Sequence, residues 1–202
     1  MGRQDKKSVL VALGEVRGKS ALAGRRAAQD CGDIGLKIGR DGVWYYQNSV
    51  IGRKPLVKLF ASVLRRENDD QYYLVTPAEK VLVHVEDAPF LAVEMTIGGG
   101  GKQQRLGFRT NLDDVVGAGP KHPLTFRPER NGSFTPFVLV RDELKARLTR
   151  PVYYELVAAA VNEGKGDKRE LGVWSGGTFF PFPVPRPPAS LEAHGDAAPL
   201  AL

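Results

Sequence analysis

The sequence predicts an α+β fold in which the second half of the chain reuses the motifs of the first. Two patterns support this fold class. Short stretches rich in Val, Tyr, Phe and Leu are separated by turn residues, which is typical of β-hairpins. Two other segments, one in each half, match a helix. With 202 residues, of which 42% are hydrophobic, the chain can bury one core or two small ones.

The first half begins with a hairpin and a helix. Residues 36–46, LKIGRDGVWYY, place Asp41-Gly42 between two strand-like stretches, and this dipeptide tolerates the positive φ angles of a tight turn. Residues 55–66, PLVKLFASVLRR, predict a helix because their apolar residues recur at helical spacing. These apolar residues are Leu56, Leu59, Phe60, Val63 and Leu64.

Four strands are expected next. Residues 71–77, QYYLVTP, and residues 80–87, KVLVHVED, predict two of them. In the second, Val81, Val83 and Val85 alternate with Leu82, His84 and Glu86. FLAVEMTI and QRLGFRTN predict the other two, which are joined across the four glycines of residues 98–101. Four consecutive glycines favour a mobile hairpin tip over a phosphate-binding loop.

The second half repeats this order. Residues 124–140, LTFRPERNGSFTPFVLV, predict a strand, a turn at Asn131-Gly132 and a second strand. RPVYYELVAAAV then corresponds to the first helix, and LGVWSGG stands where YYLVTP stood. Both helices open on a basic residue followed by proline, at Lys54-Pro55 and Arg150-Pro151. We therefore expect an internal structural repeat.

Composition and charge limit the classes of function. The single cysteine excludes an internal disulfide, and three scattered histidines give no reason to expect a metal site. The net charge is +6, but residues 1–30 carry seven basic and three acidic side chains and so contribute +4 of it. The remaining chain is nearly neutral. We therefore expect no nucleic acid on the folded part, although the basic leader could contact nucleic acid or acidic lipid.

The two ends of the sequence differ from its middle. Apolar residues in the leader, such as Leu10 and Leu13, predict a basic amphipathic helix. No apolar run approaches the roughly 20 residues of a membrane-spanning helix, and the start lacks a secretory signal pattern. We therefore expect a cytoplasmic protein with no membrane span. Proline and alanine predominate after residue 182 and predict a disordered tail.

Several long segments resemble one bacterial family. They are DCGDIGLKIGRDGVWYY, IGRKPLVKLFASVLRR and YYLVTPAEKVLVHVEDAPFLAVEM, and FRTN, HPL and GVWSGG continue the likeness, which covers residues 30 to about 182. On these segments the chain resembles the family known as domain of unknown function 1285. It departs from the family pattern in QNSVIGRKP, where Asn48 and Val50 replace the glycine and proline of a Gly-Ser-Pro-Ile turn.

This resemblance implies a two-domain α+β protein with related motifs in its halves and a cleft between them. It also implies a nucleotide-like ligand and a role in signalling, without an established activity. We expect a basic N-terminal extension at residues 1–30, an N-terminal domain at 31–88, a C-terminal domain at 89–182 and a disordered tail at 183–202.

The starts of the two helices are candidate anion sites. The first N–H groups of a helix have no partner within it, and a Ser, Thr, Asp or Asn side chain usually caps them. Lys54 cannot accept such a bond, so the N–H groups, the helix dipole, Arg53 and Lys54 would together suit an anion. The alternative is that water caps the helix and both side chains are solvated. At the second helix the Thr149 side chain can cap the first N–H groups, or Arg150 can contribute to a similar anion site.

Four further side chains complete the candidate ligand site. Arg109 and Asn111 of FRTN alternate to one face if their strand is regular, and they could hold a phosphate and a base or hydroxyl. The alternative is an ion pair between Arg109 and Glu94 across the hairpin. Trp44 and Trp174 could stack on a planar ligand, although aromatic residues on hairpins also commonly belong to the core.

Enzyme motifs are incomplete. In LVALGEVRGKS only three residues stand between Gly14 and Gly18, whereas a phosphate-binding P-loop needs four before its Gly-Lys-Ser. Ser175 lacks the hydrolase motif G-x-S-x-G because Val173 replaces its first glycine. Adjacent carboxylates at residues 113–114 could hold a metal, but a solvated turn or helix start is the simpler account. The sequence therefore favours a protein without catalytic activity over an unrecognised hydrolase, and it does not identify a cofactor.

The sequence therefore predicts a non-catalytic, ligand-sensing module with Arg53, Lys54, Arg109 and Asn111 at the anion and Trp44 or Trp174 at its planar part. The ligand would be small, anionic and nucleotide-like, and would bind between the domains. The alternative is a nucleic-acid or protein adaptor that acts through the basic leader and the proline-rich tail. The sequence makes no prediction of oligomeric state.

Overall fold

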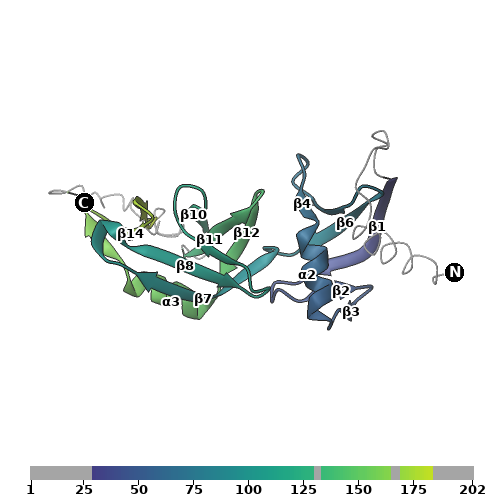
Figure 1. Ribbon diagram of the computed structural model, residues 1–202, viewed down its shortest axis with the longest axis horizontal. Coiled ribbons are helices and arrows are strands. Elements are labelled where there is room, and N and C mark those ends of the chain that lie inside the picture. The colour runs from purple at the N-terminus through teal and green to yellow at the C-terminus, as the bar shows by residue number, and fades with distance from the viewer. Residues whose placement is uncertain (1–28, 130–132, 165–168, 184–202) are drawn as a thin grey trace, which may run out of the picture. The chain divides into compact units, whose positions relative to one another are not determined.

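A computed structural model describes residues 29–129, 133–164 and 169–183 (Figure 1). These residues form two compact units, each described here by itself. Unit 1 contains residues 29–91, 110–114 and 140–146, and unit 2 contains the other described residues. The predicted leader helix, the Asn131-Gly132 turn and nearly all of the predicted tail lie outside the described residues. No helix in the described ranges is long and apolar enough to cross a membrane.

Unit 1 is built on a mixed six-stranded sheet with the strand order β3-β2-β1-β6-β5-β4. Its elements are β1 (Gln29–Ile38), β2 (Trp44–Tyr46), β3 (Ser49–Val50), α2 (Lys54–Ser62), β4 (Leu64–Arg66), β5 (Tyr72–Val75) and β6 (Glu79–Val85). Each half of the sheet is a three-stranded antiparallel meander. The two meanders join where β1 pairs in parallel with β6.

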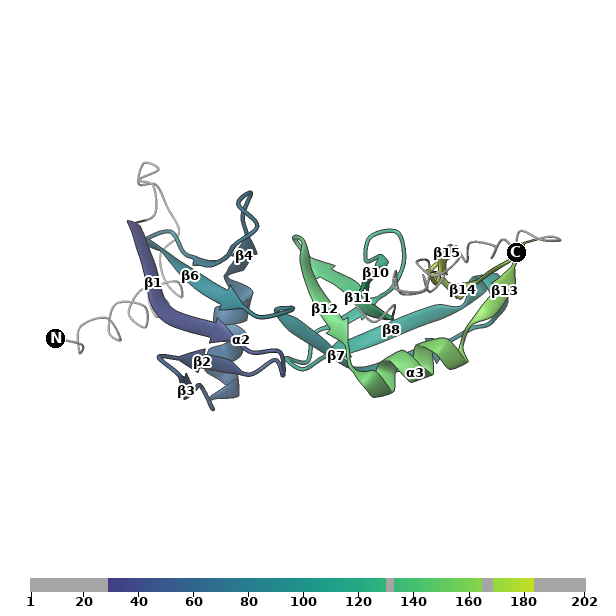
Figure 2. The same ribbon diagram turned by 180° about the vertical axis from the view of Figure 1, so that it is seen from behind.

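The core of unit 1 lies between this sheet and α2, which covers one face of the sheet (Figures 1 and 2). Val57, Phe60 and Ala61 form the buried side of the helix. Trp44 is 1% exposed, and its ring centroid lies 6.1 Å from that of Phe60. Burial of apolar surface of this kind supplies most of the favourable free energy of folding.

The structure confirms the β1–β2 hairpin, with Gly42 at φ +77°. It also accounts for Asn48, one of the two residues that depart from the family turn. Gln47 and Asn48 connect β2 to β3 with φ angles of 47° and 63°. Two positive φ angles in a two-residue loop are typical of a type I′ turn, and Asn adopts this conformation more readily than most residues.

The predicted extent of the first helix was wrong at its C-terminal end. The helix stops at Ser62, whose hydroxyl donates to the carbonyl of Leu59 over 2.7 Å. Leu64, which has helical spacing in the sequence, is instead the first residue of β4 and is fully buried opposite Leu74. Pairing within the sheet therefore overrides the local helical pattern.

A second mixed six-stranded sheet has the order β10-β11-β12-β7-β8-β9, which is the order of the first sheet read from its other edge. Its strands are β7 (Phe90–Gly98), β8 (Arg105–Thr110), β9 (Val115–Gly117), β10 (Leu124–Pro128), β11 (Phe134–Arg141) and β12 (Leu144–Leu148). A 3₁₀ turn at Gly101–Gln103 lies in the glycine-rich tip between β7 and β8. The two sheets thus have matching topology, which is consistent with two related domains.

The remaining elements of unit 2 are α3 (Arg150–Ala158) and a three-stranded sheet of β13 (Val161–Glu163), β14 (Glu170–Ser175) and β15 (Thr178–Pro181). Meander, helix and meander thus follow one another from β10 to β15 as they do from β1 to β6, in the order that the sequence predicts. One difference separates the two series. β4–β6 join the sheet of β1–β3, whereas β13–β15 form a sheet of their own.

Ser175 connects the small sheet to the large sheet within unit 2. Its fully buried hydroxyl accepts a hydrogen bond from Leu106 N–H over 2.9 Å and donates to the Ala118 carbonyl over 2.7 Å. The side chain therefore satisfies two buried backbone groups, which would otherwise carry a desolvation penalty. This structural role agrees with the lack of a hydrolase motif around Ser175.

We predict that Ser175→Ala lowers the free energy of unfolding by about 1–3 kcal/mol, because it leaves a buried N–H and a buried carbonyl without this partner. Urea unfolding followed by circular dichroism measures the change. Ser62→Ala, which removes an exposed hydroxyl at a helix end, serves as the control. Equal stability of Ser175→Ala and the wild type would contradict this role.

Candidate functional site

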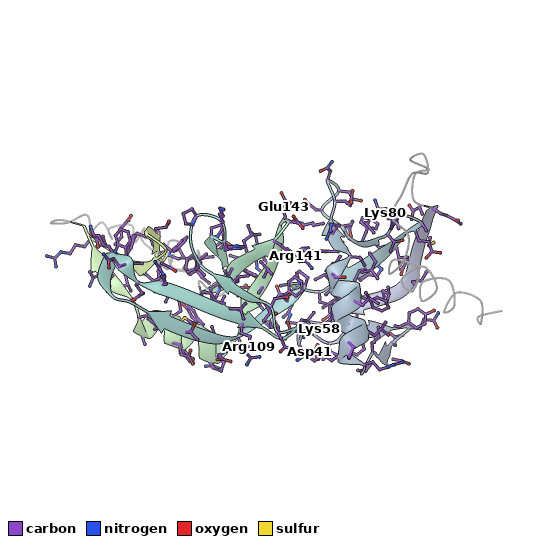
Figure 3. The ribbon with its side chains drawn as sticks, viewed as in Figure 1. Asp41, Lys58, Lys80, Arg109, Arg141 and Glu143 are labelled. Carbon is purple, nitrogen blue, oxygen red and sulfur yellow. The ribbon has the colours of Figure 1, made fainter. Side chains whose placement is uncertain are left out.

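Unit 1 contains a cavity of about 260 Å³ beside α2. Three parts of the chain line it: the helix itself, the turn between β8 and β9, and the C-terminal end of β11. Figure 3 labels two of the lining residues, Lys58 on α2 and Arg141 on β11. The lining residues are Lys58, Ala61, Ser62, Leu112, Asp113, Asp114 and Arg141. Ala61 and Leu112 are buried apolar residues. Lys58 and Arg141 contribute positive charge to the lining, and the two aspartates contribute negative charge.

Two lysines one helical turn apart define the charged side of this site. Lys54 and Lys58 stand at positions i and i+4 of α2, so they lie on one face of the helix. Lys54 Nζ lies 3.0 and 2.8 Å from the two carboxylate oxygens of Asp113, and Lys58 Nζ lies 2.8 Å from one of them. One carboxylate therefore bridges both ammonium groups.

The start of α2 has no side-chain cap and no acidic residue in its first turn, as the sequence predicts. Arg53 is the exposed N-cap residue, and its carbonyl accepts bonds from the N–H groups of Leu56 and Val57 over 2.9 and 3.1 Å. Lys54 is the first helical residue and is paired with Asp113 rather than simply solvated. The positively charged end of the helix thus attracts an anion of the chain's own.

Asp113 is held by a rigid turn rather than by a strand. Thr110, which is fully buried, accepts bonds at Oγ1 from the N–H groups of Leu112 and Asp114 over 3.3 and 3.1 Å. Its own N–H donates to the Asp114 carbonyl over 2.8 Å. Within this turn Asp113 has φ +70°, a left-handed conformation that Asp and Asn tolerate better than most residues. The expectation of a turn at residues 113–114 is confirmed.

Asn111 anchors the same turn and does not lie on β8, which ends at Thr110. Its Oδ1 accepts a bond from Leu91 N–H over 3.0 Å, and its backbone N–H donates to the Leu91 carbonyl over 2.9 Å. Its Nδ2 donates to the Gly42 carbonyl over 3.3 Å. The interpretation of Arg109 and Asn111 as two residues of one strand face is therefore wrong, because the strand ends between them.

Arg109 belongs to unit 2 and forms the ion pair that the sequence left open as an alternative. Its Nε and Nη2 lie 2.7 and 2.6 Å from one carboxylate oxygen of Glu94. The pair is exposed, with 43% and 51% of the two side chains accessible. Exposed pairs of this kind contribute little to stability, typically about 0–1 kcal/mol.

The two tryptophans have different surroundings. Trp44 lies in the core of unit 1 with 1% of its surface exposed, so it offers no face to a ligand. Trp174, in unit 2, is half-buried and donates from Nε1 to Glu163 over 2.9 Å. Lys102 Nζ lies 5.2 Å from its ring centroid, and a cation at this distance attracts the face of the ring.

Arg150 opens α3 in unit 2, as Lys54 opens α2 in unit 1. Its Nε donates to the Tyr154 hydroxyl over 2.8 Å, and its guanidinium carbon lies 5.5 Å from the Tyr154 ring centroid. Thr149 is the N-cap residue but makes no side-chain cap bond. The structure therefore places Arg150 on a neighbouring aromatic side chain.

Arg141 is a functional candidate that sequence reasoning missed. Its Nη2 donates to the Ala61 carbonyl over 2.6 Å, and its guanidinium carbon lies 5.7 Å from the Phe90 ring centroid. Its Nη1 is buried and has no hydrogen-bond partner among the described residues. No local pattern marks Arg141, whereas Lys58 could have been found as the residue one turn after Lys54.

The fold and this cavity define the class of the protein as an α+β protein of two compact units, one of which carries a cavity lined by charged side chains of both signs. The chain belongs to the DUF1285 family. Residues 26–88 match "Domain of unknown function (DUF1285), N-terminal domain", and residues 89–182 match "Protein of unknown function (DUF1285), C-terminal domain". The family resemblance stated from the sequence is therefore confirmed.

Two solved structures are similar to the chain. A DUF1285 family protein from Silicibacter pomeroyi DSS-3 is 37% identical with a TM-score of 0.70, and the match covers 84% of this chain and 93% of that one. A DUF1285 family protein from Shewanella baltica OS155 is 28% identical with a TM-score of 0.49, and the match covers 61% of this chain and 91% of that one. No curated protein matches the sequence.

The carboxylate of Asp113 that bridges the two lysines has a lowered pKa. Hydrogen bonds from Lys54 and then Lys58 lower the pKa of Asp113 from 3.8 to about 2. The folded state thus binds a proton at Asp113 less readily than the unfolded chain does. The stabilisation from these bonds is present above the ordinary pKa and is lost as the pH falls through the folded value.

We therefore predict that Asp113→Asn removes part of the acid sensitivity of stability. The difference in free energy of unfolding between the wild type and the variant should shrink as the pH falls from about 4 to about 2. Urea unfolding at a series of pH values measures this difference. Asp114→Asn, which removes a charge from the same cavity without touching either lysine, is the control. A difference that is independent of pH would contradict the assigned role of Asp113.

Proposed function

We propose that the protein is a non-catalytic module that binds a small anionic ligand at the cavity of unit 1 and acts as a ligand sensor in signalling. The observation that carries this proposal is that Lys58 and Arg141 line one cavity, while Lys54 shares with Lys58 the ion pair to Asp113 in the cavity wall. The expectation of a cleft site between the domains stays a prediction. The adaptor alternative also stays a prediction, because most of the two terminal segments lies outside the described residues.

The chemistry of the lining favours an oxyanion with a small body. Lysine ammonium groups and an arginine guanidinium are the usual partners of carboxylates and phosphates. Buried Ala61 and Leu112 offer apolar contact beside them. Pockets for drug-sized ligands have volumes of roughly 300–1,000 Å³, so a cavity of about 260 Å³ suits a phosphate or a short carboxylate. A nucleotide would place only its phosphate end there.

The polar groups of the same lining are mostly charged side chains. Among the described residues that form it, the only hydroxyl is that of Ser62, which donates to a helix carbonyl. The lining contains neither histidine nor cysteine.

We predict that millimolar phosphate, succinate or AMP raises the melting temperature of the wild-type full chain, because a ligand that binds only the folded state stabilises it by mass action. The double variant Lys58→Gln plus Arg141→Gln should lose most of this increase, since it removes two cations from the cavity. Differential scanning fluorimetry measures each shift against the same protein without ligand.

The matched control is Lys37→Gln. Lys37 also belongs to unit 1 and also forms a half-exposed ion pair, with Glu86 at 3.1 Å, but it does not line the cavity. Its variant should keep the full ligand-induced shift. The proposal fails if none of the three probes stabilises the wild type more than it stabilises the double variant. A larger shift with AMP than with phosphate would identify a nucleotide-like ligand.

A further inference from the structure

The carboxylate of Asp113 already makes the contacts that an anionic ligand would need at Lys54 and Lys58. Both of its oxygens accept from lysine ammonium groups, at distances of 2.8 to 3.0 Å. A free carboxylate or phosphate offers the same acceptor atoms at similar lengths. The structure therefore shows how these two lysines hold an oxyanion, with a residue of the chain in the place of the ligand.

We propose that Asp113 is a built-in competitor, so that the ligand's oxyanion binds Lys54 and Lys58 by displacing the Asp113 carboxylate. This inference rests on the function proposed above. Its chemistry requires only an oxyanion, which a carboxylic acid or a phosphate can supply. The ligand and the Asp113 carboxylate then compete for the same two ammonium groups. The affinity of the site for the ligand is set by the difference between the free energies of these two interactions.

The exchange is feasible because the hydrogen bonds that fix the turn do not involve the Asp113 carboxylate. The turn is fixed through Thr110 and Asn111, which bond to backbone groups. The side chains of Asp113, Lys54 and Lys58 are 41%, 53% and 44% exposed. Ion pairs at such exposure are weak, so the carboxylate can leave the lysines while the turn keeps its backbone bonds.

Arg141 lines the cavity together with Lys58 and Asp113. Its positive charge attracts an anion that enters the cavity. A ligand larger than a carboxylate group can therefore interact with Arg141 as well as with the two lysines.

The test compares binding of inorganic phosphate and of succinate to the full-length wild type and to Asp113→Asn by isothermal titration calorimetry. We expect Asp113→Asn to bind the preferred probe about three to ten times more tightly, since the two competing ion pairs are exposed and individually weak. Asn suits the φ of +70° at this position, so the change removes charge without adding backbone strain. Asp113→Gly, which also suits this φ, is the second variant if Asp113→Asn is unstable.

Asp114→Asn is the matched control because it removes one negative charge from the same lining but has no ion pair with either lysine. It should change the affinity by less than about twofold if direct occupancy, rather than general repulsion, is the cause. Adding Lys54→Gln and Lys58→Gln to Asp113→Asn should abolish the gain.

Each outcome supports or overturns the competitor role of Asp113, and one outcome also bears on the proposed function. Tighter binding by Asp113→Asn, with or without detectable binding by the wild type, supports the competitor. Wild-type binding that is equal to or tighter than that of Asp113→Asn overturns the competitor but leaves the proposed function intact. Equal gains in Asp113→Asn and Asp114→Asn also overturn it. If neither the wild type nor Asp113→Asn binds either probe, the inference fails, and the proposed function fails with it when AMP also gives no stabilisation of the wild type.

Discussion

The parallel pairing of β1 with β6 is the constraint on which the arrangement of unit 1 depends. Because these strands occupy the middle of the sheet, β3 and β4 lie at its opposite edges, and the connection between them must cross the whole sheet. Six strands at about 4.8 Å spacing place the two edges about 24 Å apart. The nine residues of α2 cover about 14 Å of this distance. The helix must therefore lie across the sheet, with Phe60 against it and Lys58 on the other side.

The elements that could be predicted from the sequence are those with local causes. The Asp41-Gly42 hairpin and the strand at residues 80–87 were predicted correctly, because turn chemistry and side-chain alternation act over a few residues. The end of the first helix was not, because Leu64 fits both a helical stripe and a strand facing Leu74. Only the neighbouring strand decides between them. The same applies to the separate sheet of β13–β15, whose order along the chain was predicted but whose pairing was not.

The candidate site, like the fold, could be predicted only in part from the sequence. A proline preceded by a basic residue indicates an uncapped helix start, and the structure has one at Arg53 and Lys54. Arg109 and Asn111 are neighbours in sequence, yet one pairs with Glu94 and the other anchors a turn, because β8 ends between them. Arg141 comes to the cavity from a strand 80 residues beyond Ala61 in the sequence, to which it donates. Such contacts follow from topology, which local spacing does not encode.

Unit 1 is built from three separate stretches of the chain, so the ribosome synthesises its parts at different times. The wall of the cavity comes partly from residues 110–114 and from Arg141, which the ribosome adds long after α2. Nascent chains generally fold as their segments emerge, so the six-stranded sheet of unit 1 can pair its strands before the cavity has its second and third sides. A chain interrupted before residue 141 would carry the lysines of α2 without Arg141. The wall of the cavity is thus completed only after residue 141 has been added, well after α2 and the sheet of unit 1 have been synthesised.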